Sequence, residues 1–201
     1  MRLARALAAS AVVIVLASGS AAPSPLLTQS DLPAGWSLET VASHADAVMP
    51  TRALCGGSSL TARARRAGGA ADGRVTFIAD SFTGPVLNES RWGFPTARRA
   101  TDFLRAVGRA ARRCAAAHHV DRLSGVRSTV AVAPVVLAAA DDALRVAQRA
   151  EGSAITTAGD SLYLRTGTTV LAVTLSGYEV DHALTDRFAS LALAKLTRAL
   201  G

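Results

Sequence analysis

The sequence is poor in lysine, cysteine and aromatic residues, and each shortage narrows what the protein can be. Lys195 is the single lysine among 22 basic residues, so arginine supplies nearly all of the positive charge. Aromatic residues make up 4% of the chain, which provides few platforms for stacking bases and argues against nucleic-acid binding. Two cysteines cannot complete a closed four-ligand zinc site. The absence of repeats and heptads excludes solenoids and coiled coils.

The composition is that of a folded domain. Hydrophobic residues account for 50% of the 201 residues and charged residues for 18%, which is too apolar for a disordered chain. A chain of this length predicts one domain preceded by a short leader.

The first 21 residues have the layout of a secretory signal peptide. Arg2 and Arg5 precede an uncharged apolar run over 6–17, and small residues follow over 18–22. We expect cleavage after Ala21 or Ala22, with Ala21 preferred, and loss of the two arginines lowers the formal net charge from +7 to +5. The apolar run is short for a membrane span, although an uncleaved anchor is the alternative. Position 20 is serine, so no lipobox cysteine is present. These features predict an exported, unlipidated protein that is secreted or associated with the envelope, with no membrane span left after cleavage.

Cys55 and Cys114 both lie in the exported part of the chain. An even cysteine count in an oxidising compartment predicts a disulfide, with two buried free thiols as the alternative. The closed loop of about 60 residues would contribute roughly 4 kcal/mol in the chain-entropy model.

The first half of the mature chain predicts a hairpin followed by a long helix. Residues 74–82 and 86–92 are strand-like and flank a Gly-Pro turn signal, whereas 61–73 predicts an exposed loop. Apolar residues recur at helical spacing over 96–117, which places Cys114 on the inward face. Smaller elements are a helical turn over 29–32 capped by Thr28, a strand over 36–41, and a short helix that begins at Pro50 and carries Cys55.

The second half predicts strands and a final helix. Residues 126–137 are valine-rich but contain Pro134, which favours an edge position, and 143–150 alternates in polarity. A hairpin is predicted for 161–165 and 169–175, with the second of these strands central because both of its faces are apolar. A helix over 181–200 should cross the sheet. Tight strand connections with segregated helices indicate an α+β fold.

Several strings, in order, resemble the PknH-like exported sensor domains of actinobacterial envelopes. They are the Asp-Leu-Pro-x-Gly opening within 26–36, the helix that follows Phe94-Pro95-Thr96, the late hairpin over 161–177, and the last helix. The resemblance implies a twisted antiparallel sheet flanked by helices, with a cleft that binds a small-molecule, glycan or lipid ligand of the envelope, and no catalysis or cofactor. On this view residues 1–21 are the signal peptide, 22–35 a linker and turn, and 36–201 the sensor domain. The best-known member of this family is the extracellular domain of a serine/threonine kinase, which has two cysteine pairs. This chain differs in having one cysteine pair and no kinase catalytic domain.

An alternative interpretation is a small secreted hydrolase. Residues 159–162 spell Gly-Asp-Ser-Leu, the nucleophile motif of one esterase class, with Ser161 as the nucleophile. That chemistry requires a strand-to-helix turn and a distant histidine, whereas this motif leads into a strand. We therefore interpret it as a turn before a hairpin strand.

Candidate ligand-binding residues come from the basic helix and from the scarce aromatics. Arg98, Arg105 and Arg109 lie on the polar stripe of helix 96–117, and Trp92 and Tyr163 are aromatics that could line a cleft. A third interpretation is that this stripe binds an anionic envelope polymer, against the simpler one of a solvated helix face. His118, His119 and Asp121 cluster without complementary ligands, so no metal site is predicted.

Overall fold

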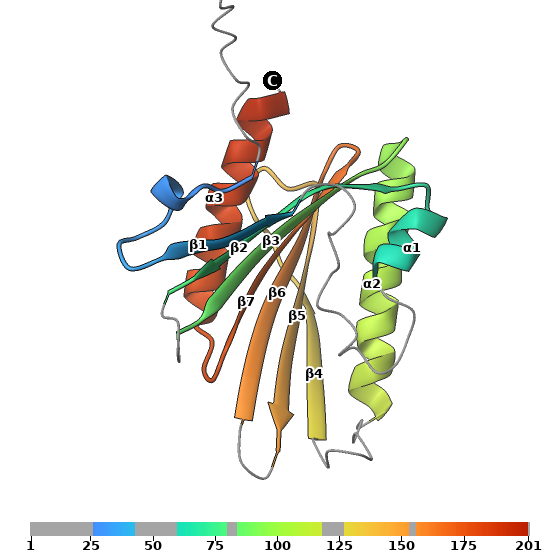
Figure 1. Ribbon diagram of the computed structural model, residues 1–201. Coiled ribbons are helices and arrows are strands. Elements are labelled where there is room, and N and C mark those ends of the chain that lie inside the picture. Colours follow the sequence, from blue (N-terminus) through green and yellow to red (C-terminus); the bar gives the residue numbers. More distant parts are fainter. Residues whose placement is uncertain (1–25, 43–59, 80–83, 118–126, 153–155, 201) are drawn as a thin grey trace, which may run out of the picture.

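The computed structural model describes residues 26–42, 60–79, 84–117, 127–152 and 156–200 (Figure 1). The predicted signal peptide, the short helix from Pro50, Cys55, His118, His119 and Asp121 lie outside the described residues. No helix in the described ranges is long and apolar enough to cross a membrane.

The described chain contains seven strands and three α-helices. In order they are η1 (Gln29–Asp31), β1 (Ser37–Ala42), α1 (Leu60–Arg66), β2 (Ala70–Ile78), β3 (Val86–Gly93), α2 (Ala97–Ala117), β4 (Arg127–Pro134), β5 (Asp142–Glu151), β6 (Thr156–Thr166), β7 (Thr169–Gly177) and α3 (His182–Leu200).

All seven strands join one antiparallel sheet in the order β1-β2-β3-β7-β6-β5-β4. The predicted α+β class is confirmed, and so are both hairpins, β2–β3 and β6–β7. β7 is the fourth of the seven strands, as its two apolar faces predicted, and β4 is an edge strand that ends at Pro134.

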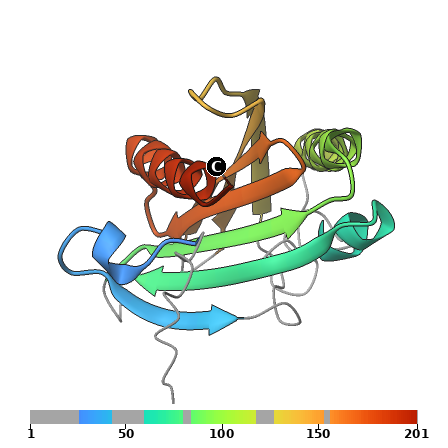
Figure 2. The ribbon, with the colours of Figure 1, turned by 90° about the horizontal axis from the view of Figure 1, so that it is seen from above.

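The two long helices cover opposite faces of the sheet (Figure 2). Alternate residues of each central strand therefore enter different cores, and both cores are apolar. One, the α2 core, consists of Ala64, Trp92, Phe94, Ala100, Phe103, Leu104, Val107, Ala111, Cys114, Leu144, Val146, Tyr163, Val170 and Ala172. The other, the α3 core, consists of Leu26, Leu27, Trp36, Val75, Phe77, Leu87, Leu162, Leu164, Leu171, Val173, Leu175, Phe188, Ala189, Ala192 and Leu193.

Helix α2 follows its sequence pattern closely. Phe103, Val107 and Cys114 are buried, and the arginines of the opposite stripe are exposed. Cys114 thus lies on the inward face as predicted, and the described part of the chain holds no free cysteine. Because Cys55 lies outside the described residues, its pairing with Cys114 stays a prediction.

Two segments in the first half of the chain differ from what the sequence predicted. The expected exposed loop over 61–73 forms α1 and the start of β2, because alanine and arginine favour helix and Ala64 packs into the α2 core. In the expected linker and turn, Leu26 and Leu27 are buried in the α3 core. Leu26 lies over Gly73, where a Cβ atom would come within 2.7 Å of the Leu26 side chain.

Candidate ligand-binding site

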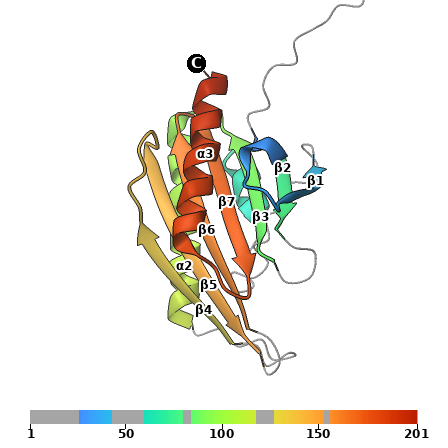
Figure 3. The same ribbon diagram turned by 90° about the vertical axis from the view of Figure 1, so that its left-hand side faces the viewer.

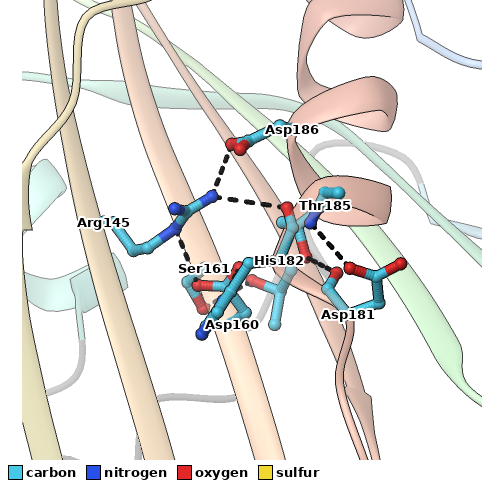
Figure 4. A network of polar contacts seen from close by, with 9 residues as sticks. Arg145, Asp160, Ser161, Asp181, His182, Thr185 and Asp186 are labelled. Atoms are coloured by element: carbon cyan, nitrogen blue, oxygen red, sulfur yellow. Dashed lines mark hydrogen bonds and ion pairs between the residues drawn. The ribbon is translucent and has the colours of Figure 1, made fainter.

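A buried carboxylate organises the α3 face of the sheet. Asp160, in the middle of β6, is fully inaccessible to solvent. Its Oδ2 lies 2.7 Å from Nδ1 of His182, the first residue of α3, and its Oδ1 lies 3.2 Å from Nε of Arg145 on β5. A buried charge is tolerated only when it is paired. The two contacts supply that pairing and join the start of α3 to two strands (Figure 4).

Arg145 continues the network into the helix. Its Nη2 donates to Asp186, one turn into α3, and also approaches the carbonyl oxygen of His182 at 3.5 Å. The Arg145 side chain is 19% exposed, so its guanidinium lies between the sheet and the helix rather than in bulk water. Two carboxylates thus hold one arginine, and the arginine fixes where α3 begins on the sheet.

The first turn of α3 is fixed by its cap. The side chain of Asp181 accepts a hydrogen bond of 2.8 Å from the N–H of Ala183, and the buried Thr185 hydroxyl donates to the Asp181 carbonyl oxygen at 3.2 Å. An acidic N-cap satisfies free N–H groups and suits the helix dipole. The His182 imidazole is therefore held in place while 57% of its side chain stays exposed.

An open pocket of about 520 Å³ lies beside His182. Helix α3 packs mainly on β6 and β7, so the neighbouring strands β4 and β5 extend past it (Figure 3). The pocket floor is made of small residues on three strands, and its rim carries the polar groups. The lining residues are Thr129, Val130, Ala131, Ala147, Gln148, Arg149, Ala158, Gly159, Glu179, Val180 and His182.

The pocket combines an apolar floor with groups of both charges. Arg149 supplies a guanidinium that pairs with Glu151 at 2.8 Å, Glu179 supplies a carboxylate, and His182 an imidazole. Small concave sites with a few convergent polar groups are typical of ligand binding. Among the described residues, no hydrogen bond joins His182 to a serine, threonine or cysteine side chain.

Ser161 lies on the opposite face of the sheet from this network. Its Oγ is 2.9 Å from Oγ1 of Thr174, and it hydrogen-bonds the buried hydroxyl of Tyr163, a member of the α2 core. Because neighbouring strand residues point to opposite faces, Ser161 cannot reach the imidazole that Asp160 holds. The predicted turn before Ser161 is also wrong, since Gly159 and Asp160 lie within β6, where both neighbouring strands pair with them.

The sequence-derived candidates do not gather at one place. Trp92 is 0% exposed and Tyr163 is 2% exposed, so both are core residues beneath α2. Burial raises the pKa of Tyr163 to about 12, with the Ser161 hydrogen bond acting in the opposite direction. Arg98, Arg105 and Arg109 are exposed on the outer side of α2, across the sheet from the pocket.

A second buried carboxylate lies beneath the N-terminal segment. Glu89 of β3 is fully buried and its Oε2 accepts a 2.6 Å hydrogen bond from the N–H of Leu27. Burial raises its pKa to about 7, against the opposing effects of that hydrogen bond and of the positive charges of Lys195 and Arg91. Lys195 itself pairs with Asp31 at 2.5 Å, which ties η1 to α3.

Sequence reasoning missed Arg145, Asp160 and His182 because they come from three separate elements. The one available signal was Asp160, an acid that directly precedes a strongly apolar strand segment. Among the described residues there is no group of three histidine, cysteine, aspartate or glutamate side chains that could hold a metal.

Comparison with known proteins identifies the fold. No family model matches the chain, and no curated protein matches it in sequence. The structure is similar to the crystal structure of the extracellular domain of PknH from Mycobacterium tuberculosis, with a TM-score of 0.63 and 14% sequence identity. The match covers 88% of this chain and 93% of that one. The chain therefore has the fold of a PknH-like sensor domain, as its sequence motifs indicated.

Proposed function

We propose that the protein is an exported, non-enzymatic sensor-type domain that binds a small envelope-derived ligand in the pocket beside α3. The observation that carries this proposal is the pocket of about 520 Å³ bordered by His182, whose side chain is held by the buried Asp160. A fold shared with an extracellular sensor domain and a leader with signal-peptide layout support an extracytoplasmic location.

The lining favours a ligand that has both an apolar surface and polar groups. Alanine and glycine residues on β4, β5 and β6 leave a flat apolar floor for a ring or a short acyl chain. Arg149, Glu179 and His182 at the rim can hydrogen-bond hydroxyl, carboxylate or amine groups. A sugar or an amphiphilic lipid fragment carries both features.

The test is native mass spectrometry of the mature protein isolated from an envelope or culture fraction. A mass adduct that disappears on denaturation is the expected result. The variant Ala131→Leu places a larger side chain on the exposed floor of the pocket, in an edge strand that tolerates leucine, and should abolish the adduct.

Ala133→Leu is the matched control. Ala133 lies two residues further along β4 on the same face, is exposed, and does not line the pocket. It should keep the adduct. A wild-type protein that carries no adduct, or an adduct that Ala131→Leu retains in full, would argue against this pocket as the site.

A further inference from the structure

The outer face of α2 concentrates positive charge that no other part of the described chain neutralises. Arginines 98, 99, 105, 109, 112 and 113 are all exposed, and Asp102 is the one acidic residue of the helix. None of these arginines takes part in an ion pair with a described residue. Elsewhere Arg145 and Arg165 each contact two aspartates. The α2 arginines therefore differ from Arg145 and Arg165, whose charges are neutralised by aspartates within the fold.

Four of these arginines form a straight row, here called the α2 row: Arg98, Arg105, Arg109 and Arg112. At 100° per residue they fall within an arc of about 60°, and at 1.5 Å per residue they extend over about 21 Å. A row of this length and spacing fits several consecutive anionic groups of an extended chain. Arginine suits such groups because its planar fork bonds two oxygens at once.

A hollow interrupts the row at Gly108. The absence of a side chain there opens a cavity of about 150 Å³ between α2 and the start of β5, with Arg105 and Arg112 on its lining. Asp142 also lines this hollow, but its carboxylate is paired with Arg165 at 2.9 Å. A Cβ atom at position 108 would lie 3.2 Å from the Leu144 side chain and 3.3 Å from Arg112. The hollow therefore depends on glycine.

From these observations we infer that the α2 row binds a linear, phosphate-bearing polymer, with one phosphate seated in the Gly108 hollow between Arg105 and Arg112. Two features argue against a bilayer surface and against a nucleic acid as the partner. The large exposed hydrophobic residues of the described chain all lie outside α2, so the helix has no apolar face to enter a bilayer. The row also lacks exposed aromatic side chains on which bases could stack. This site lies on the opposite face from the proposed ligand pocket and does not depend on it.

The test uses long-chain inorganic polyphosphate, end-labelled and followed by fluorescence anisotropy over a series of salt concentrations. If four arginines each contact one phosphate, the logarithm of the affinity should fall with the logarithm of salt with a slope of about −3. The double variant Arg105→Gln/Arg112→Gln should bind about tenfold more weakly at low salt and should lose about half of that slope.

Arg187→Gln/Arg198→Gln is the charge-matched control, because both residues are exposed on α3 and form no ion pair among the described residues. This control variant should bind within about twofold of the wild type, since it removes positive charge only far from the α2 row. Gly108→Ala keeps every charge and favours helix, yet places a methyl group in the hollow against Leu144 and Arg112, and should weaken binding severalfold.

Four results would overturn the inference. They are an equal loss in both double variants, unchanged binding by Gly108→Ala, equal competition by orthophosphate at the same total phosphate concentration, and tighter binding to phosphatidylglycerol vesicles than to polyphosphate. The last of these would assign the row to a membrane surface instead.

Discussion

The two long helices lie on opposite faces of one sheet and use charge in opposite ways. Beside α3, the guanidinium of Arg145 is held between Asp160 and Asp186, and the carboxylate of Asp160 is fully buried. On α2, the row from Arg98 to Arg112 points to solvent without a described partner. Paired charge fixes where an element sits, whereas unpaired charge remains available to another molecule. The paired charges beside α3 therefore position that helix on the sheet, whereas the charges of the α2 row face solvent.

The same two helices also differ in how much of the sheet they cover. Helix α2 contacts four strands, from β4 to β7. Helix α3 packs mainly on β6 and β7, so it leaves alanine-rich strand surface open beside His182. The pocket thus follows from where α3 begins, and the Asp160 contacts set that place.

Loss of the predicted disulfide should have the largest effect, and it should act on the α2 side. Reduction, or the double variant Cys55→Ser/Cys114→Ser, should lower the free energy of unfolding by roughly 4 kcal/mol, because Cys114 anchors α2 through a closed loop of about 60 residues. Thermal unfolding with and without reductant measures it. An unchanged melting temperature in reductant would contradict the pairing.

Replacement of Asp160 should have the next largest effect, on the α3 side. Asp160→Asn removes a buried charge from beneath Arg145 and His182, and breaking such a pair costs about 3 kcal/mol or more. Asp186→Asn is the matched control, because that side chain is 41% exposed and its ion pair should contribute less than about 1 kcal/mol. Urea unfolding compares the two variants. Equal losses would show that Asp160 does not fix the start of α3.

The pH dependence of stability should be the third effect, and it comes from Glu89. Its pKa is raised from 4.5 to about 7 in the folded state, so the folded protein holds the proton more tightly than the unfolded chain does. Stability should therefore fall as pH rises from 4.5 to 7, by at most about 3 kcal/mol, and level off above that. The pKa of Asp31 is lowered, so its contribution is lost only at more acidic pH.

Glu89→Gln isolates this effect, because glutamine still accepts the hydrogen bond from the N–H of Leu27 and cannot ionise. The difference in stability between variant and wild type should grow from pH 4.5 to 7. The other charged groups that act on this site, Lys195, Arg91 and Asp31, are the same in both proteins. A constant difference would show that Glu89 does not titrate in this range.

The sequence predicted those parts of the structure that depend on local pattern. Helix α2, both hairpins and the central place of β7 follow from spacing and turn signals that neighbouring residues carry. Leu87, Glu89 and Arg91 share one face of β3, a pattern typical of a half-exposed strand. Glu89 is nevertheless buried, because the N-terminal segment covers it, and that contact joins residues 62 positions apart.

The candidate site depended on contacts that no local pattern records. Asp160, Arg145 and His182 meet because register places β5 beside β6 and α3 returns over them. Glycine and aspartate are also poor strand formers, which is why residues 159 and 160 predicted a turn. Pairing with strands on both sides outweighs that preference in the folded sheet. Tertiary contacts thus form the site, and they also explain why the turn predicted at residues 159 and 160 is wrong.

The smallest expected effect is that of Ser161→Ala, and it separates the two faces most cleanly. The variant loses the hydrogen bond between Ser161 and Thr174 on the α2 side, which should cost about 1 kcal/mol of unfolding free energy. Thr174→Val should cost a similar amount, and the double variant should cost less than the sum because both single changes break one bond. Ester hydrolysis by the purified protein should not depend on Ser161, since His182 lies across the sheet. Activity that vanishes in Ser161→Ala while the fold persists would require the serine to reach a base that this architecture keeps on the other face.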